Sequence, residues 1–345
     1  MALRTHNCGE LNKNHIDQTV KLSGWVNSIR THGQIIFIDI RDRFGKTQIV
    51  LNSDELIKIG KTLSNEDVIN IEGKVSLRSK DLINPDLKTG EIEILGEKMM
   101  VLSSAEPMPM SIQDRDASSE EHRLKYRYLE LRNNDLQKNI IIRHNTAQVV
   151  RNFLSENNFL EIETPVLMKS TPEGARDYLV PSRVHNGKFY ALPQSPQMYK
   201  QLFMISGLDR YFQIVKCFRD EDLRSDRQPE FTQIDLEMSF VDEEDVRSIV
   251  EKLLTKVFKE VINVELKEFP ILSYHDAIEK YGTDKPDLRF DITIEDFKTF
   301  SNKSDFKAFS DCDSVRIISV PNGEFFTRKI IDELDSYAQS LGAKG

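Results

Sequence analysis

The sequence predicts a multidomain α+β protein: a small β-barrel, then a mostly antiparallel sheet with helices, then the start of an α/β module. Residues 1–103 consist almost wholly of short strand-like runs. Residues 119–285 mix helical and strand-like patterns in an irregular order, which favours an antiparallel sheet over a βαβ repeat. The pattern changes again at residues 286–345, and a chain of 345 residues has room for two or three domains.

The barrel prediction rests on alternation of apolar and polar residues and on β-branched content. Five runs have these properties, at residues 20–26, 34–40, 46–51, 68–75 and 91–102. Residues 53–66, between the third and fourth runs, have helical spacing instead. Five strands with one helix after the third is the order of an OB-type barrel, a common oligonucleotide-binding scaffold. The pattern alone also fits other small β-barrels.

The elements after the barrel follow from local signals. Residues 104–118 contain two prolines and no periodicity, which predicts a linker. Residues 118–132 predict a helix that begins at a serine N-cap with acids in its first turn. A longer amphipathic helix follows, and then strands alternate with helices: helix 133–158, strands 159–167, 188–193, 210–218 and 230–240, and helices 195–207 and 242–262.

Charge and cysteine content limit the classes of protein. The net charge of −9 argues against a loose, charge-driven coating of nucleic acid but is compatible with a local basic face. The polar start contains no secretory signal, and no apolar run approaches the ~18 residues of a membrane span. The three cysteines form no C-x-x-C pair, which argues against a disulfide framework and a cysteine zinc site. We therefore expect a cytoplasmic protein without a membrane segment.

The stretch FRDEDLRSDRQPEF, residues 218–231, is the first candidate site. One interpretation is a solvated hairpin, as most charge runs are. The other is that the apolar strand before it holds Arg219 rigidly, so that the guanidinium offers paired donors to a phosphate or carboxylate. Asp220 and Glu221 could orient that arginine or accept from a ribose or amine. Neither of the two common glycine-rich nucleotide loops occurs in the sequence.

A second candidate site lies in residues 171–183 and 190–201. Glu173 precedes a glycine in a predicted turn, where an exposed carboxylate could bind an ammonium group. Gln197 and Lys200 are three residues apart at a predicted helix start and therefore share a face. The alternative is that Ser195 is an N-cap, with Pro196 at the first helical position.

Taken together, these segments resemble the bacterial aspartyl-tRNA synthetases, a class II family. The resemblance is carried by ETPVL, TPEGARDY, QSPQMYKQ and FRDEDLRSDRQPEFTQID in that order, and it extends over essentially the whole chain. Residues 139–167 resemble the family's first motif, which implies a homodimer, and residues 218–237 resemble the second, whose loop closes over ATP and the tRNA acceptor end. Residues 281–289 are similar to the lead into the family's insertion domain.

The resemblance implies roles for individual residues. Aspartate would be bound by Glu173, Gln197, Lys200 and Arg219, and ATP by Arg219, Asp220, Glu221 and Gln228. Arg219 would also be the catalytic residue, because it would stabilise charge that develops as the aspartate carboxylate attacks the α-phosphorus. Mg²⁺ is implied as well, with its ligands expected outside these residues, so that no metal ligand is assigned here.

In the barrel, the resemblance implies a site for the tRNA anticodon. Phe37 would stack on a base, and Arg30, Gln48 and Asn84 would read or position its neighbours. Periodicity alone instead predicts that Phe37 is a core residue. His32 is typical of family members that charge both tRNA(Asp) and tRNA(Asn), whereas the second discriminating position, near Asp81, fits neither pattern.

The sequence also departs from the family. The third class II motif is missing, so we expect the chain to be the N-terminal portion of a longer protein. A tRNA-binding fragment without catalytic activity is the main alternative. A sister ligase for asparagine or lysine and a free-standing amino-acid-activating paralogue are further alternatives; the GARDYLVPSR run argues against the former and the barrel against the latter.

Overall fold

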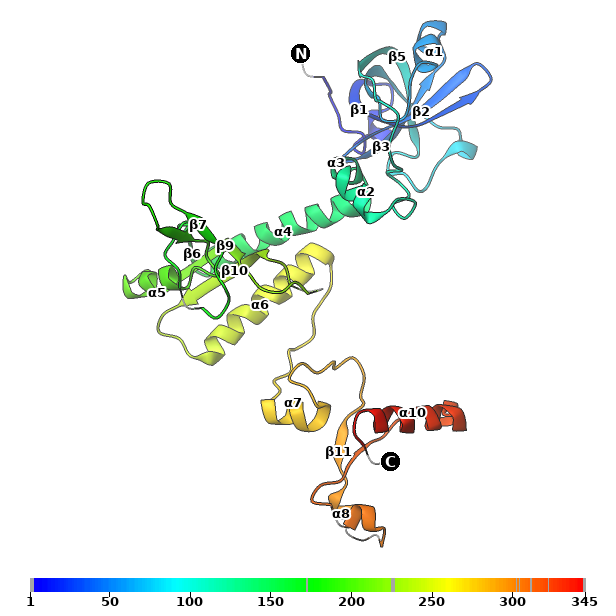
Figure 1. Ribbon diagram of the computed structural model, residues 1–345. Helices are drawn as coiled ribbons and strands as arrows, with labels where there is room; N and C mark the ends of the chain where they lie inside the picture. The colour runs from blue at the N-terminus through cyan, green and yellow to red at the C-terminus, as the bar shows by residue number, and fades with distance from the viewer. Residues whose placement is uncertain are drawn as a thin grey trace. The chain divides into compact units, whose positions relative to one another are not determined.

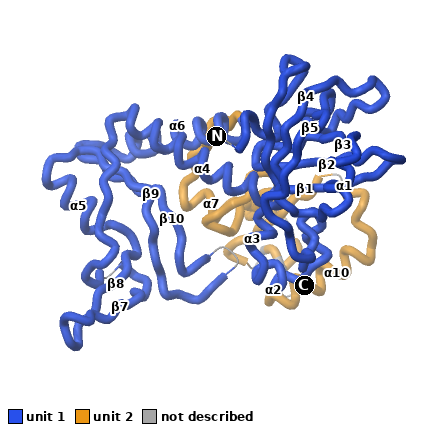
Figure 2. Tube along the Cα trace, turned by 90° about the horizontal axis from the view of Figure 1, so that it is seen from above, with its two compact units in different colours: residues 1–264 blue, residues 265–345 orange. Residues whose placement is uncertain are grey.

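The computed structural model describes residues 3–171, 173–224, 227–301, 303, 305–310, 312–321 and 323–343 (Figure 1). The chain divides into two compact units, residues 1–264 and 265–345, which Figure 2 shows in different colours. The domain boundaries predicted after residues 103, 118 and 285 remain predictions.

The first unit begins with the predicted barrel. Within the continuously described residues 3–171, five strands close into a barrel in the order β1-β2-β3-β5-β4. Its elements are η1 (Lys13–His15), β1 (Thr19–His32), β2 (Ile35–Asp42), β3 (Gly45–Leu51), α1 (Asp54–Gly60), β4 (Val68–Leu77), η2 (Lys80–Leu82) and β5 (Ile92–Ser103). The helix lies after the third strand, as predicted, and Ser53 caps it by accepting from Leu56 N.

Alternation along each strand fills the barrel. On β2, Ile36, Ile38 and Ile40 are buried in the core, whereas Phe37 and Asp39 point to the outer face and are half-buried. The interpretation of Phe37 as a core residue is therefore wrong. β3 pairs with β5 in parallel and with β2 in antiparallel orientation, which closes the barrel without leaving a free sheet edge.

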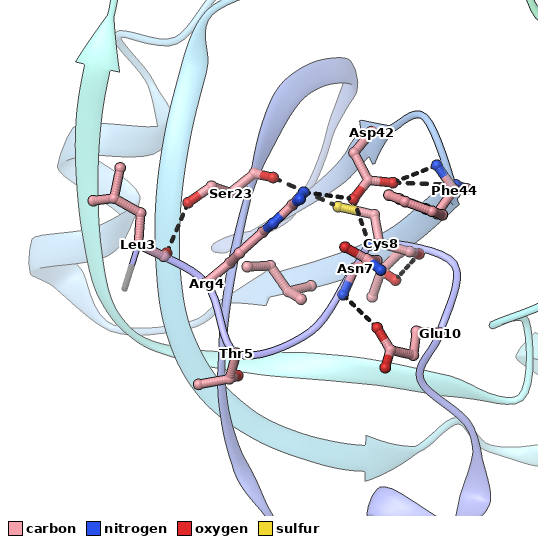
Figure 3. Close-up of polar contacts among 12 residues, drawn as sticks. Leu3, Arg4, Thr5, Asn7, Cys8, Glu10, Ser23, Asp42 and Phe44 are labelled. Atoms are coloured by element: carbon pink, nitrogen blue, oxygen red, sulfur yellow. Dashed lines mark hydrogen bonds and ion pairs between the residues drawn. The ribbon is translucent and has the colours of Figure 1, made fainter. Parts of the chain in front are cut away.

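The carboxylate of Asp42 is one of the groups that hold the N-terminal segment on the barrel (Figure 3). Asp42 Oδ2 accepts the N–H of Cys8 at 3.0 Å and lies 3.5 Å from Arg4 Nη1, while Oδ1 accepts the N–H groups of Phe44 at 2.8 Å and Gly45 at 3.2 Å. Burial raises the pKa of the Cys8 thiol, with Asp42 adding to the effect, so the thiol is neutral and part of the core.

Three helices connect the barrel to the second sheet: α2 (Glu120–Lys125), α3 (Arg127–Glu130) and α4 (Asn134–Glu156). Ser119 is the predicted N-cap and accepts from His122 N. The helix predicted over residues 118–132 is wrong in its continuity, because it breaks at Tyr126. After the break, α3 places Glu130, which is 1% exposed, in contact with three arginines; they are Arg115, Arg123 and Arg127. A buried carboxylate needs such positively charged partners. These tertiary contacts outweigh the local preference for a continuous helix.

The described strands of the second sheet have the order β10-β9-β6, with β10 antiparallel and β6 parallel to β9. The elements are β6 (Leu160–Glu161), β7 (Leu179–Pro181), β8 (Phe189–Ala191), α5 (Gln197–Ile205), β9 (Arg210–Phe218), β10 (Glu230–Met238) and α6 (Glu243–Ile262). The strand predicted over residues 159–167 contains only two paired residues, and Pro165, which lacks an N–H, cannot extend the ladder. Helices α4 and α6 cover one face of the sheet (Figure 1).

The described part of the second unit combines helices with an antiparallel pair of short strands. Its elements are α7 (Tyr274–Tyr281), β11 (Ile294–Asp296), α8 (Lys298–Ser301), α9 (Lys307–Ser310), β12 (Arg316–Ile318), η3 (Gly323–Phe325) and α10 (Arg328–Ser340). β11 and β12 are antiparallel. This agrees with the α/β character predicted for residues 286–345. No helix in the described part of the chain is long and apolar enough to cross a membrane.

Candidate functional site

The β9–β10 pair has one apolar and one polar face, and the polar face is the candidate site. Phe212, Ile214 and Leu236 point to the helix side and pack in the core with α4 and α6. Opposed residues in an antiparallel pair share a face, so the register places Gln213 beside Asp235 and Tyr211 beside Glu237 on the other side. The apolar face thus anchors the strands that carry the polar residues.

Lys200 lies over this polar face. Its Nζ donates to Asp235 Oδ1 at 2.9 Å and lies 3.3 Å from Glu237 Oε2. The side chains of Lys200 and Asp235 are 12% and 9% exposed. Burial disfavours the charge on Lys200, but the hydrogen bond and charge of Asp235, with Glu237, outweigh it and raise the pKa of Lys200. For Asp235 burial dominates and its pKa is raised, although Lys200 opposes the change.

Glu173 is held by two hydroxyl groups. Ser195 Oγ donates to Glu173 Oε2 at 2.6 Å, and Thr171 Oγ1 donates to Oε1 at 3.1 Å. The N-cap interpretation of Ser195 is wrong: α5 begins at Gln197 after Pro196, without a side-chain cap, and the hydroxyl serves Glu173 instead. Gln197 therefore opens the helix that carries Lys200 one turn later.

The buried Gln194 attaches the Glu173 loop to the start of α5. Its Oε1 accepts from Ala175 N at 3.1 Å, and its Nε2 donates to Ala175 O at 3.0 Å and to Asp177. This reciprocal pairing with one backbone unit fixes the loop against the helix start. Glu173 therefore has a defined position relative to Gln197 and Lys200.

Arg219 forms a pocket of about 440 Å³ with the loop after β9. The pocket is lined by Arg219, Glu221, Asp222, Leu223, Arg227, Gln228 and Phe231. The guanidinium carbon of Arg219 lies 5.1 Å from the centre of the Phe231 ring, and Arg219 N donates to Pro229 O at 2.9 Å, so both side chain and backbone are positioned. Three of the four predicted ATP residues meet here. Ser225 and Asp226 lie outside the described residues.

Asp220, the fourth predicted ATP residue, is exposed and does not line this pocket; its N–H donates to Arg176 O at 3.0 Å. That bond joins the end of β9 to the loop that carries Glu173. Cys217 on β9 lies directly opposite Phe231 on β10. Its buried thiol is therefore on the same face of the strand pair as Phe231 and Asp235. Burial raises the pKa of Cys217 to about 11, with Asp235, Arg219, Glu173 and Lys200 all close enough to affect it. The Asp220–Arg176 hydrogen bond and the shared strand pair thus place the two candidate sites of the sequence next to each other.

Two residues of this site were missed by sequence reasoning. The sequence pattern predicts a helix cap at Ser195 and no more than an alternating strand at Asp235. The alternation of residues 230–240 could have found Asp235, since it shares its strand face with Gln233 and Glu237 and not with the apolar residues that face the helices. No local signal distinguishes Ser195 from an ordinary helix cap.

The predicted anticodon residues of the barrel form a polar cluster on the outer face of β1, β2 and β3. Arg30 Nη2 donates to Asp39 Oδ1 at 3.0 Å and to Gln48 Oε1 at 3.1 Å, and Gln48 Nε2 donates to Glu93 Oε2 at 2.9 Å. Phe37 lies opposite Arg30 in the strand register. Arg30 is thus positioned beside an aromatic side chain, with 57% of its own side chain exposed.

The other barrel residues lie on connections. His32 is the exposed last residue of β1, at the β1–β2 turn. Asp81 lies in η2 and Asn84 just after it, where Asn84 N donates to Gly90 O at 3.1 Å and Asn84 Oδ1 accepts from Asp86 N at 3.0 Å.

As for metals, no group of three His, Cys, Asp or Glu side chains in the described ranges could hold an ion.

Comparisons with known proteins identify families for both parts of the chain. A model of the family "tRNA synthetases class II (D, K and N)" matches residues 119–329, and a model of the "OB-fold nucleic acid binding domain" matches residues 20–102. The chain is 51% identical over 350 residues to an aspartate–tRNA(Asp/Asn) ligase of Desulfatibacillum aliphaticivorans, covering 99% of this chain and 59% of the relative. The corresponding ligase of Aquifex aeolicus is 51% identical over 349 residues, with 99% and 58% covered. The chain thus spans about three-fifths of the length of these relatives.

Solved structures show the same fold. The asparaginyl-tRNA synthetase of Pyrococcus horikoshii complexed with asparaginyl-adenylate superimposes with a TM-score of 0.67 at 24% identity, over 75% of this chain and 58% of that one. A putative aspartyl-tRNA synthetase of Leishmania major Friedlin gives 0.64 at 22% identity, over 73% and 51%. The predicted fold class, an OB barrel followed by a class II catalytic domain, is confirmed. The chain belongs to the class II tRNA synthetases of the D, K and N group.

Proposed function

We propose that this chain carries the amino-acid-activating and anticodon-binding parts of an aspartate–tRNA ligase. Such an enzyme joins L-aspartate to ATP as aspartyl-adenylate and transfers the aspartyl group to the 3′ end of tRNA. The observation that carries the proposal is the polar site on β9–β10, where Lys200 contacts Asp235 and Glu237, and where Glu173 and the Arg219 pocket lie on adjoining segments. The names of the relatives at 51% identity support the choice of aspartate.

The charges of the site match free aspartate. Lys200 Nζ has three N–H donors, of which Asp235 and Glu237 take two, so the third is open to the side-chain carboxylate of the substrate. Glu173 would accept from the ammonium group. Gln197, at the start of the Lys200 helix, would complete the amino-acid subsite.

The reaction needs no protein nucleophile. The α-carboxylate of aspartate would attack the α-phosphorus of ATP, forming the acyl-phosphate bond and releasing pyrophosphate. Arg219, fixed over Phe231, would stabilise the charge that develops on the α-phosphate, and Glu221 and Gln228 would hold ATP in the pocket with Asp220 at its edge. ATP would arrive with Mg²⁺, whose protein ligands the resemblance places outside these 345 residues.

The outer face of the barrel would bind the anticodon of tRNA(Asp), with Phe37 stacked on a base and Arg30, Gln48 and Asn84 near its neighbours. His32, together with the Asp/Asn names of the relatives, extends the proposal to tRNA(Asn), whereas Asp81 favours neither tRNA range. A cytoplasmic location goes with this role.

A homodimer through the first motif is part of the proposal. Ile140, Ile141 and Ile142 on α4 are 53%, 41% and 39% exposed, and Val166 and Leu167 after the motif proline are 46% and 53% exposed. Consecutive apolar side chains on one exposed helix segment are typical of a protein interface.

The test is aspartate-dependent ATP–pyrophosphate exchange, measured on the 345-residue chain and on the same chain extended through its natural reading frame. Exchange with aspartate and not with asparagine or lysine in either form supports the proposal. Exchange in neither form, with tRNA binding retained, would favour the alternative of an RNA-binding protein without catalysis.

A further inference from the structure

Although the chain carries a net charge of −9, positively charged side chains gather in a groove of the first unit. This basic groove has a volume of about 360 Å³ and lies between the β2–β3 turn, the loop that precedes β5 and the start of α4. Five basic residues line it: Arg41 and Arg43 from β2 and its turn, Lys46 from β3, Lys88 from the loop and Lys138 from the helix.

Three of these five cations have no acidic partner. Arg43, Lys46 and Lys88 form no ion pair with any carboxylate in the described part of the chain. In contrast, Arg41 is paired with a buried glutamate of the barrel, and Lys138 is paired with an aspartate of its own helix. Uncompensated cations that line one groove raise the local electrostatic potential and attract a polyanion, whatever the net charge of the whole chain.

The turn that carries Arg43 is held in shape by Asp42 (Figure 3). Asp42 Oδ1 accepts the N–H groups of Phe44 at 2.8 Å and Gly45 at 3.2 Å, and Oδ2 lies 3.5 Å from Arg4 Nη1, which balances the charge of the carboxylate. Phe44 is 44% exposed, and the guanidinium carbon of Arg43 lies 4.6 Å from the centre of its ring. An exposed aromatic ring beside cations is typical of sites for single-stranded RNA, because a base can stack on the ring.

The basic groove adjoins the predicted anticodon residues. Lys46 lies two residues before Gln48 on the outer face of β3, which is about 7 Å along the strand. Lys88 lies in the same loop as Asn84, and Thr89 Oγ1 donates to Lys46 O at 2.5 Å, which attaches this loop to β3. An RNA strand that reaches Gln48 can therefore continue into the groove without leaving the surface of the barrel.

We propose that the basic groove binds one further nucleotide of the tRNA anticodon loop, with its base against Phe44 and its phosphate between Lys46 and Lys88. The inference rests on the proposed function, because it takes Arg30 and Phe37 as the neighbouring contacts to the anticodon. RNA is the ligand class that the observations favour, since the groove combines an exposed ring with uncompensated cations and continues the proposed RNA-binding face of the barrel.

The test compares Lys46→Gln/Lys88→Gln with wild type in the protein encoded by the natural reading frame. The probe is an RNA hairpin with the anticodon stem and loop of tRNA(Asp), and fluorescence anisotropy measures its dissociation constant between about 50 and about 200 mM salt. Each phosphate contact to a single strand contributes about 0.7 to the slope of log affinity against log salt, so the double variant should lower that slope by about 1.4. The loss of affinity should then be about sevenfold larger at the lower salt concentration than at the higher one.

Phe44→Ala removes the ring without removing a charge. It should weaken hairpin binding about tenfold at every salt concentration, the magnitude of one base stacked on an aromatic side chain. Lys46→Arg/Lys88→Arg keeps both charges and should bind the hairpin with the wild-type slope. Because Phe44, Lys46 and Lys88 lie outside the barrel core, each variant should keep the fold, which circular dichroism checks.

Lys21→Gln/Lys74→Gln is the matched control. It also removes two lysines from the barrel, but Lys21 is paired with Glu72 at 3.0 Å and Lys74 with Asp17 at 2.9 Å. The net charge of the protein changes by the same amount, so a general electrostatic effect would appear in both double variants. The control should keep the wild-type slope.

The outcomes separate this inference from the proposed function. Wild-type protein that does not bind the hairpin, or that shows no aspartate-dependent pyrophosphate exchange, contradicts the proposed function itself. Wild-type binding with an unchanged slope in Lys46→Gln/Lys88→Gln, or an equal change in the control, overturns the RNA site and leaves the proposed function intact. A double variant that keeps its slope and loses dimerisation in analytical ultracentrifugation also overturns it, and would assign the groove to a second copy of the chain.

Discussion

Arg132, two residues before the long helix α4, forms an ion pair with the carboxylate of Glu66 in the barrel. Glu66 is also bound by both terminal nitrogens of Arg41, at 2.6 and 2.7 Å, and it has the left-handed backbone angle φ of 73°. Non-glycine residues adopt this conformation at a cost that surrounding contacts must offset. The Arg132 guanidinium carbon lies 5.2 Å from the centre of the Trp25 ring. One buried carboxylate thus links the barrel to the helix that leads to the active-site sheet.

Glu66→Ala should therefore destabilise the barrel end of the first unit. It leaves the buried Arg41 without its partner, and breaking such a pair costs about 3–5 kcal/mol. Urea unfolding followed by the fluorescence of Trp25, the one tryptophan in the sequence, measures the loss. Glu72→Ala, which removes contacts to Lys21 and Lys98 on the barrel surface, is the control and should change little. A Glu66 variant as stable as this control would contradict the proposed link.

The Glu130 cluster predicts a pH dependence of stability. Burial disfavours the charge of Glu130, but hydrogen bonds from Arg127 and Arg115 outweigh it and hold the pKa of Glu130 below its ordinary value. A carboxylate with a lowered folded-state pKa stabilises the fold above its unfolded pKa of about 4.3, and this stabilisation is lost as the pH falls through the folded-state value. Glu130→Gln should thus lower the melting temperature at pH 7, and the difference from wild type should shrink below about pH 4. A difference that is constant with pH would assign the effect to packing.

The barrel could be predicted from the sequence because each strand carries its own signal. Ile36, Ile38 and Ile40 alternate with outward residues, and this period of two is a local property. The break at Tyr126 and the two-residue β6 could not be predicted this way. The first depends on distant arginines that gather around Glu130, and the second on which residues find a partner in β9.

The same distinction between local signals and distant contacts holds for the residues of the candidate site. Glu173, Lys200 and Arg219 were found through motifs, and the structure brings them together through a fixed loop and a shared strand pair. Ser195 could not be predicted as a site residue, because the sequence does not show whether its hydroxyl binds a helix N–H or Glu173. The folded structure determines this partner. Side-chain hydrogen bonds between segments are not encoded in local periodicity.

Arg219→Ala should abolish adenylate formation while leaving the fold intact. Removing one donor to a developing oxyanion typically costs 10²–10³ in rate, and Arg219 is proposed to contact both aspartate and the α-phosphate. Pyrophosphate exchange in the full-length protein measures the loss, and circular dichroism checks the fold. Arg247→Ala, a surface change on α6 that removes an ion pair to Glu244, serves as control. Near-normal turnover of Arg219→Ala would refute the catalytic role.

Lys200→Met should impair the use of aspartate more than that of ATP. The variant loses the cation proposed to meet the substrate side chain and leaves Asp235, which is 9% exposed, without its charge partner. We expect KM for aspartate to rise at least tenfold with KM for ATP within about twofold of wild type, since the Arg219 pocket is lined by other residues. Equal increases in both constants would show that Lys200 supports the whole site and does not select the amino acid.

Arg30→Ala should separate tRNA charging from adenylate formation. Arg30 is held by Asp39 and Gln48 beside Phe37 on the barrel, and more than half of its side chain is exposed to a ligand. Losing it should raise KM for tRNA(Asp) in aminoacylation by about tenfold, the magnitude of one good contact to a base, and leave pyrophosphate exchange at the wild-type rate. Lys21→Ala, which removes the surface pair with Glu72 on the same barrel, controls for loss of a basic side chain. An equal loss in both assays would assign Arg30 to the support of the fold, because a residue that only reads the anticodon has no part in activating free aspartate.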